Sequence, residues 1–220
     1  MVIDTLSFST SAVTAVHHGG IVYPCAKNED PIAFAKRAKA SAAVARQDVP
    51  EKGLYSLSPL TFLHLEPNTR LVLSSPNGAT CSHYASDVPY LLIGTLINAK
   101  AVAEKLTHLL ETTEHILTLL SCGERWTEPN ADGELRWALE DDLGAGAILS
   151  YLAGDKSPEA MAAEGSFYQL ENQLSSALVD CASGRELAAK GFESDVRHAA
   201  KLNLYASVPM MYNDHLKEFR

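Results

Sequence analysis

The chain has 220 residues, of which 46% are hydrophobic and 20% are charged. This composition can build a sizeable buried core and argues against a disordered chain. The formal net charge of -9 excludes proteins that need a basic surface to bind nucleic acid or an anionic membrane. The cysteines are widely spaced, so their pattern indicates neither a disulfide framework nor a zinc motif. Because a chain without a disulfide framework suits a reducing compartment, we expect a cytoplasmic protein.

Short apolar runs alternate with longer helical stretches, and this alternation predicts an α/β fold. We expect one domain over residues 1–220, or two closely packed lobes. The predicted strands are Met1–Asp4, Ile21–Cys25, Leu71–Ser74, Leu91–Thr95, Ile116–Leu120 and Leu204–Val208. The predicted helices are Ser9–His18, Pro31–Gln47, Asn98–Glu111 and Glu140–Leu152, followed by two or three helical pieces to about residue 201.

Three stretches are predicted to be irregular: residues 49–68, the turn at Pro76-Asn77-Gly78 and the segment Gly123–Arg136. Ligands of open α/β sheets bind at the edge where the parallel strands end. The polar residues that follow the predicted strands are therefore the candidate site residues.

Asp4 ends the first apolar strand and stands just before a predicted helix N-terminus, where Ser9 and Thr10 offer hydroxyl groups. A carboxylate that holds a cation beside an anion-binding helix start suits phosphoryl transfer. The alternative is an Asp that only caps a turn.

Glu140 and Asp141 belong to an acidic helix start that continues into Gly144 and Gly146. Glycine is a poor helix former, so its use here implies close approach of a ligand or another backbone. Neighbouring residues do not share a helix face, so the two acids should have different partners. Simple stabilisation of the helix dipole is the alternative.

Five further positions have both a functional and an ordinary interpretation. Asn77 and Gly78 form an oxyanion cradle or only a turn, and Asp195 is a site carboxylate or an N-cap. Arg125 and Arg136 suit bidentate capture of phosphate or sulfonate, although surface arginines are common. In contrast, Lys36, Arg37, Lys39 and Arg46 are predicted to form the solvated face of their helix.

Several phosphatase and hydrolase motifs are absent from the sequence. There is no phosphate-binding loop of the G-x-x-x-x-G-K-[ST] type and no G-x-S-x-G elbow. Leu6 stands where an aspartyl-phosphate phosphatase would need its second acid.

Five segments, in order along most of the chain, resemble the 2-phosphosulfolactate phosphatase family. They are Val2-Ile3-Asp4-Thr5-Leu6 with Ser9–Ala15, Pro76-Asn77-Gly78-Ala79, Leu92–Ala99, Ser121-Cys122-Gly123 with Leu139–Ala147, and Gly184-Arg185-Glu186-Leu187 with Gly191 and Asp195-Val196. The chain departs from the family pattern at Ser7, where the opening motif has an arginine, and in its reduced loop at 49–68.

The resemblance implies a layered α/β/α sandwich and Mg²⁺-dependent hydrolysis of a small phosphorylated acid, as in a route to coenzyme M. It places catalytic and metal-binding roles on Asp4, Glu140, Asp141 and Asp195. Together with the pattern above, it places substrate-binding roles on Ser9, Thr10, Asn77, Gly78, Asn98, Arg125 and Arg136.

We therefore expect a cytoplasmic Mg²⁺-dependent phosphatase with a small anionic phosphate-ester substrate and no nucleic-acid or membrane partner. Carboxylate oxygens suit Mg²⁺ better than Zn²⁺. A homodimer is one option for the assembly. The alternatives are a phosphatase for another small phosphorylated acid and a non-catalytic relative that binds an anion.

Overall fold

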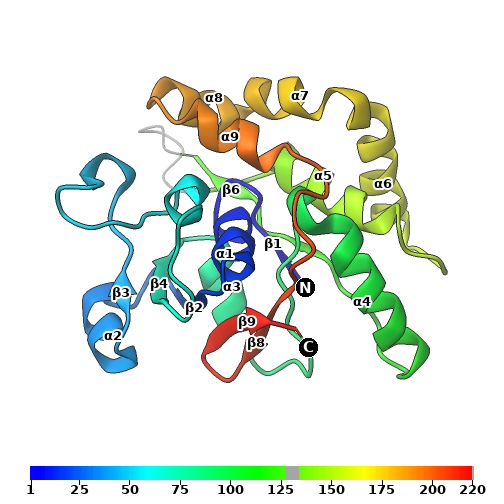
Figure 1. Ribbon diagram of the computed structural model, residues 1–220. Coiled ribbons are helices and arrows are strands. Elements are labelled where there is room, and N and C mark those ends of the chain that lie inside the picture. Colours follow the sequence, from blue (N-terminus) through cyan, green and yellow to red (C-terminus); the bar gives the residue numbers. More distant parts are fainter. Residues whose placement is uncertain (127–133, 220) are drawn as a thin grey trace.

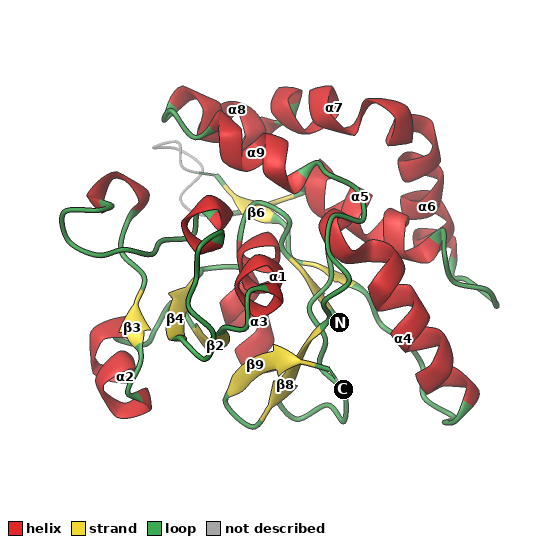
Figure 2. Ribbon diagram, in the orientation of Figure 1, coloured by secondary structure: helices red, strands yellow, loops and turns green. Residues whose placement is uncertain are grey.

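The computed structural model describes residues 1–126 and 134–219 (Figure 1). Its centre is a mixed sheet flanked by helices, which confirms the predicted α/β class (Figure 2). The larger part of the sheet has the order β3 (Ser41–Ala42), β4 (Arg70–Ser74), β2 (Ile21–Cys25), β9 (His215–Glu218), β8 (Pro209–Tyr212). The smaller parts are the parallel pair β1 (Val2–Ile3) and β5 (Leu120–Ser121), and the antiparallel pair β6 (Glu124–Arg125) and β7 (Leu135–Arg136).

Residues Leu92 and Ile93 join the five-stranded part of the sheet to the β1–β5 pair. Leu92 pairs with Met210 of β8, and Ile93 pairs with Val2 of β1. The sheet therefore continues from β3 across the C-terminal hairpin to β5.

The helices surround this sheet (Figure 2). The α-helices are α1 (Phe8–His17), α2 (Pro31–Ala38), α3 (Gly78–Tyr84), α4 (Ala99–Glu111), α5 (Leu139–Leu149), α6 (Pro158–Leu170), α7 (Leu174–Asp180), α8 (Ala182–Ala189) and α9 (Glu193–Ala199). The 3-10 turns are η1 (Arg46–Asp48), η2 (Pro59–Phe62), η3 (Leu96–Asn98) and η4 (Glu171–Gln173).

Local sequence signals explain several boundaries. Asp30 caps α2 by accepting hydrogen bonds from the backbone N–H groups of Ile32 and Ala33, as its place before Pro31 predicts. The predicted extension of this helix to Gln47 is wrong. The helix ends at Ala38, since Lys39 adopts the left-handed conformation (φ 51°) and the chain then enters β3.

The C-terminal region also differs from the prediction. The strand expected at Leu204–Val208 is absent, and the hairpin β8–β9 follows it, beginning at Pro209. Asn213, with φ 57°, occupies the turn between its strands. The predicted strand Leu91–Thr95 is present only as the bridges of Leu92 and Ile93, and the helical region up to residue 201 contains α6, α7, α8 and α9. Of the predicted loop Gly123–Arg136, residues 127–133 lie outside the described part of the chain.

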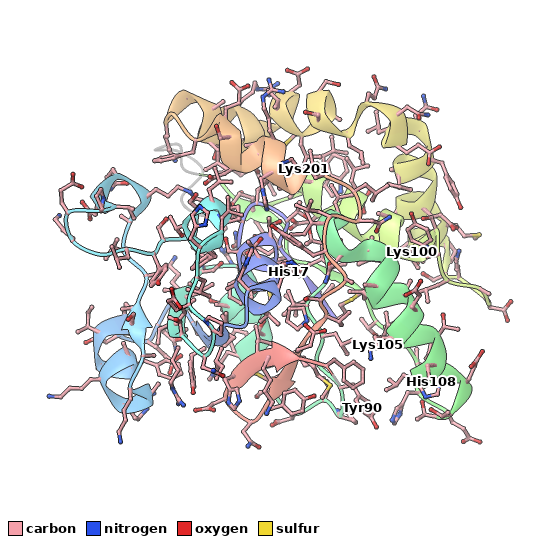
Figure 3. The ribbon with its side chains drawn as sticks, in the orientation of Figure 1. His17, Tyr90, Lys100, Lys105, His108 and Lys201 are labelled. Carbon is pink, nitrogen blue, oxygen red and sulfur yellow. The ribbon has the colours of Figure 1, made fainter. Side chains whose placement is uncertain are left out.

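Two large and separate clusters of buried apolar side chains form most of the core. One cluster joins α1 and α3 to β2 and β4, through residues such as Phe8, Val22 and Leu71. The other joins β1 to α4, α5, α6, α7 and α9. Lys100, Lys105 and His108 lie on the exposed face of α4 (Figure 3), so only its opposite face enters the core. Within the described residues, no helix is both long enough and apolar enough to cross a membrane.

His198 connects α9 to α1 and gives the fold a pH-dependent stability. The ring is 4% exposed, and its Nε2 lies 3.5 Å from Thr14 Oγ1. Burial lowers the pKa of His198 below 6.5, Lys201 and His18 lower it further, and Asp195 opposes them. The folded protein therefore keeps this ring neutral at pH values where the unfolded chain protonates it, and stability is lost as pH falls below about 6.5.

We expect H198Q to reduce the fall in melting temperature between pH 7.5 and 5.5, as measured by circular dichroism. The exposed His83, replaced by H83Q, is the control and should keep the wild-type slope. Identical slopes for wild type and H198Q would show that His198 does not contribute to the pH dependence of stability.

Candidate active site

Asp4 lies at the end of β1, where the backbone turns into α1. Its carboxylate accepts hydrogen bonds from Gly78 N (2.7 Å), Ser75 Oγ (3.1 Å) and Phe8 N (3.2 Å). Burial raises the pKa of Asp4 to about 6, Glu124 raises it as well, and the three hydrogen bonds oppose this rise. A backbone N–H group at the N-terminus of α1, that of Phe8, therefore donates its hydrogen bond to the carboxylate of Asp4.

Asp141, in the first turn of α5, lies beside Asp4. Its Oδ1 accepts from Thr5 N (2.7 Å), and its Oδ2 accepts from Gly123 N (3.0 Å). Burial raises the pKa of Asp141 well above its ordinary value, and the charges of Asp4 and then Glu140 raise it further. Residues that are far apart in sequence thus place two buried carboxylates at one edge of the sheet.

Gly78 makes the close approach of α3 to Asp4 possible. An added Cβ at this position would lie 2.7 Å from Asp4 Oδ2 and 2.5 Å from the Phe8 ring. The Pro76-Asn77-Gly78 turn is thus also the start of α3, a helix that the sequence pattern did not reveal.

A small cavity of about 180 Å³ opens onto Asp4. Asn77 belongs to its wall and donates from Nδ2 to Glu124 Oε1 (2.8 Å). The complete lining is Asp4, Leu6, Ser7, Arg46, Leu57, Ser75, Pro76, Asn77, Glu124, Ser183, Glu186, Leu187 and Lys190.

Arg46 is a site residue that the sequence pattern missed. The predicted solvated helix face does not exist, because Arg46 belongs to η1 in the following loop. Its Nε donates to Asp195 Oδ2 (2.9 Å), and its Nη2 donates to Ser7 Oγ (2.6 Å) and to the Leu57 carbonyl (2.9 Å). These contacts span up to 149 positions in sequence, so no local signal announces them.

The other two predicted acids have different partners. Asp195 accepts from Arg46 and from Ser58 Oγ (2.6 Å). Glu140 accepts a hydrogen bond from Cys181 Sγ (3.4 Å), on the side of α5 that faces the start of α8. Glu140 and Asp141 therefore do point to different partners, as their spacing predicts.

The predicted substrate-binding residues separate into two groups. Asn77 and Gly78 adjoin Asp4, whereas Ser9, Thr10 and Asn98 are completely buried. Ser9 Oγ accepts from Asp4 N, Thr10 Oγ1 donates to the Thr5 carbonyl, and Asn98 bonds to Thr95 N, Ile93 O and Ser207 O. These three side chains hold the loops of the site in place.

The two predicted arginines lie on the β6–β7 pair. Arg125 is exposed. Arg136 is buried and donates to Ser183 Oγ and Glu186 Oε1, both at 3.1 Å. Ser183 and Glu186 line the cavity, so Arg136 supports the cavity wall through its hydrogen bonds to these two residues.

The predicted set of Asp4, Glu140, Asp141 and Asp195 does not fit around one ion. In residues 1–126 and 134–219, no three His, Cys, Asp or Glu side chains are grouped to hold a metal. Asp4 and Asp141 are close through Thr5, whose N–H donates to Asp141, and one or two carboxylates completed by water and substrate phosphate are a ligand set typical of Mg²⁺. Burial is the main cause of the raised pKa of Asp141, and the charge of Asp4 raises it further, an effect that a bound cation would relieve.

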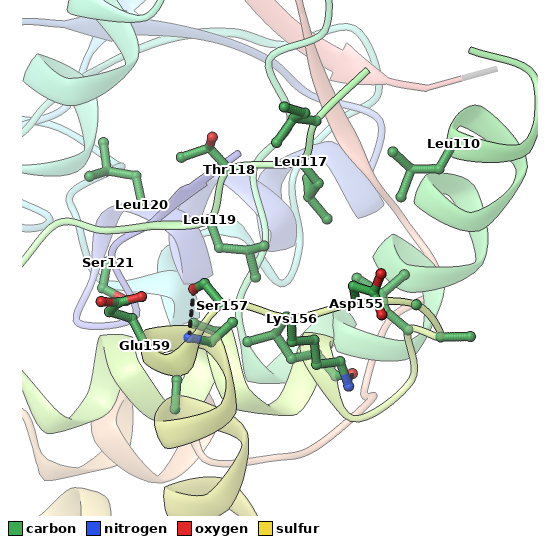
Figure 4. A pocket seen from close by; sticks show the side chains of 18 of the residues that line it. Leu110, Leu117, Thr118, Leu119, Leu120, Ser121, Asp155, Lys156, Ser157 and Glu159 are labelled. Carbon is green, nitrogen blue, oxygen red and sulfur yellow. Dashed lines mark hydrogen bonds between the residues drawn. The ribbon is translucent and has the colours of Figure 1, made fainter. Parts of the chain in front are cut away.

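A larger cavity of about 850 Å³ lies between segment 115–121 and the α5–α6 region (Figure 4). Leu110, Leu117, Leu119 and Leu120 contribute to its wall. Its charged groups include Lys156, which is paired with Glu164 (2.6 Å). None of the catalytic acids predicted from the sequence lines this cavity, so the Asp4 cavity is the candidate site.

Comparison with known proteins assigns the chain to a family. The model of the family described as 2-phosphosulpholactate phosphatase matches residues 1–214. A protein of Carboxydothermus hydrogenoformans named "Probable 2-phosphosulfolactate phosphatase" is 31% identical, over 100% of this chain and 87% of its own length. A protein of the same name from Parasynechococcus marenigrum is 30% identical, over 95% of this chain and 87% of its own. The chain is thus a member of the 2-phosphosulfolactate phosphatase family, and a probable phosphatase.

Proposed function

We propose that this protein hydrolyses the phosphate ester of a small acid in an Mg²⁺-dependent reaction, with 2-phosphosulfolactate as the leading substrate. The observation that supports this proposal is the pair of buried carboxylates of Asp4 and Asp141. Asp4 lines a small cavity that also contains Arg46, and Asp141 lies behind it, bonded to the backbone N–H of Thr5. Membership of the family supports the chemistry of a phosphatase, and the name of the relative from Carboxydothermus hydrogenoformans supports the substrate.

Asp4 and Asp141 would hold Mg²⁺, which when bound neutralises charge on the phosphoryl group and orients water. Backbone N–H groups fix both carboxylates, so the pair is preorganised. Asn77 lies at the cavity wall and can donate to a phosphoryl oxygen if its amide leaves Glu124.

Glu124 is our assignment for the general base. It lines the cavity and is hydrogen-bonded by a neutral amide, whereas Glu186 is already paired with Arg136. Water oxygen attacks phosphorus, Glu124 accepts the proton of the water, and the bond between phosphorus and the ester oxygen breaks. The departing alkoxide takes a proton from solvent and leaves as the hydroxy acid, which for the leading substrate is sulfolactate.

Phosphate release from a panel of esters, with Mg²⁺ and after chelation, tests the proposal. We expect turnover of 2-phosphosulfolactate that requires the divalent ion, in a cytoplasmic route towards coenzyme M. Preferred turnover of another phosphorylated acid would change the substrate and keep the reaction. Anion binding with no turnover under any divalent ion would show a non-catalytic relative and overturn the proposal.

A further inference from the structure

The wall of the Asp4 cavity carries both carboxylates and cations. Asp4, Ser75, Asn77 and Glu124 form an acidic group that is connected through the Asp4–Ser75, Ser75–Asn77 and Asn77–Glu124 bonds. The cations of the wall are Arg46 and Lys190, which form its basic part, and its remaining carboxylate, Glu186, is paired with Arg136. A ligand that fills this cavity therefore meets both signs of charge.

The guanidinium of Arg46 is held in one orientation. Nε is fixed by Asp195 and Nη2 by Ser7 and Leu57. Asp195 is itself held by Ser58 Oγ, and its side chain is only 3% exposed. This network removes much of the rotational freedom that an arginine loses when it binds an anion.

One edge of this guanidinium remains available to a ligand. In the described part of the chain, no group accepts a hydrogen bond from Nη1 of Arg46. The side chain of Arg46 is 16% exposed, and the residue lines the cavity. Lys190 adds a second positive charge at the exposed end of the same wall. A charged N–H donor of this kind forms strong hydrogen bonds to the oxygens of anionic groups such as a carboxylate or a sulfonate.

We infer that Arg46 binds the carboxylate or sulfonate of the substrate and makes the enzyme selective for phosphate esters of acids. Asp195 is then a positioning residue for Arg46. This inference rests on the proposed function, in which the phosphoryl group lies at Asp4 and Asp141. The acidic tail of the substrate then reaches the basic part of the wall, where it replaces solvent on Nη1.

Two esters that differ only in the acid test this role. 2-Phosphoglycerate carries a carboxylate where glycerol 2-phosphate carries a hydroxymethyl group. In R46Q we expect kcat/KM for 2-phosphoglycerate to fall about 10- to 100-fold, mainly through KM, because a charge-assisted hydrogen bond is lost. The value for glycerol 2-phosphate should stay within about threefold of wild type, since that ester makes no such contact.

Matched variants separate this role from a structural one. Arg197 lies on α9 with Asp195 but pairs with Glu193 and is largely exposed, so R197Q should behave as wild type towards both esters. D195N should reproduce the selective KM increase of R46Q, and the double variant should add little to it. R46K keeps a charge but loses the fork, so its KM should lie between those of wild type and R46Q.

An equal loss for both esters in R46Q, or no loss for either, overturns the inference while leaving the phosphatase proposal intact. If wild type hydrolyses neither ester with any divalent ion, calorimetric binding of glycerate decides. Glycerate binding that is at least tenfold weaker in R46Q than in wild type and R197Q supports the role of Arg46. Equal binding, or no binding to wild type, contradicts it.

Discussion

Replacing Asp4 by asparagine is expected to lower kcat/KM by about 1,000-fold, within the range found when a principal catalytic group is removed. The asparagine keeps the shape of the side chain but removes the charge that attracts a divalent ion. It also replaces one of the two oxygens by an amide N–H₂ group, which then faces either Gly78 N or Phe8 N and costs about 1–3 kcal/mol. Activity should therefore fall much further than stability, as shown by steady-state kinetics beside thermal melts.

Asp142 provides the control for this substitution. It is the neighbour of Asp141 on α5, but it lines the larger cavity and not the Asp4 cavity. D142N should keep kcat/KM close to the wild-type value. If D4N turned over substrate at a similar rate to D142N, Asp4 would be only a residue that organises the turn.

Replacing Gly146 by alanine should destabilise the fold by about 3 kcal/mol, at the upper end of typical overpacking effects. A Cβ on Gly146 would lie 2.1 Å from the carbonyl oxygen of Ala163 in α6. Backbone atoms cannot turn away as a flexible side chain can, so α5 and α6 would have to separate. Urea unfolding, monitored by circular dichroism, should show a lower midpoint.

Gly165, two positions after Ala163 and on the exposed face of α6, is the matched control. No atom lies within 4 Å of a Cβ at this position. G165A should therefore stabilise the helix by about 0.5–1 kcal/mol, because alanine loses less backbone entropy than glycine. A midpoint for G146A equal to that of wild type would mean that the two helices have room to separate.

The sequence predicted the parts of the site that depend on local pattern. Asp4 follows an apolar strand, and Asp141 opens a helix, so each could be placed at the same edge of a parallel sheet. The partners of these acids could not be assigned in this way. Whether Asp195 faced a metal ion or Arg46 depended on how the loop that contains η1 folds. The contact between Arg46 and Asp195 joins residues 149 positions apart.

The same distinction between local pattern and long-range contacts explains the errors in the predicted fold. The strand β2 and the cap at Asp30 have strong local signals and were predicted correctly. The short helix α3 begins at a glycine, a poor helix former, and is stabilised by its contacts with Asp4 and β2, so propensity pointed to a turn. Ser7 stands where the family motif has an arginine, and the structure places the guanidinium of Arg46 against its hydroxyl group.

The C-terminal hairpin has a consequence for how the chain is made. Its strand β9 pairs with β2, and its strand β8 connects through Leu92 to the β1 side. During synthesis on the ribosome, the two halves of the sheet cannot be joined before residues 209–218 have been made. A truncation that removes this hairpin should therefore leave two unconnected, aggregation-prone edges.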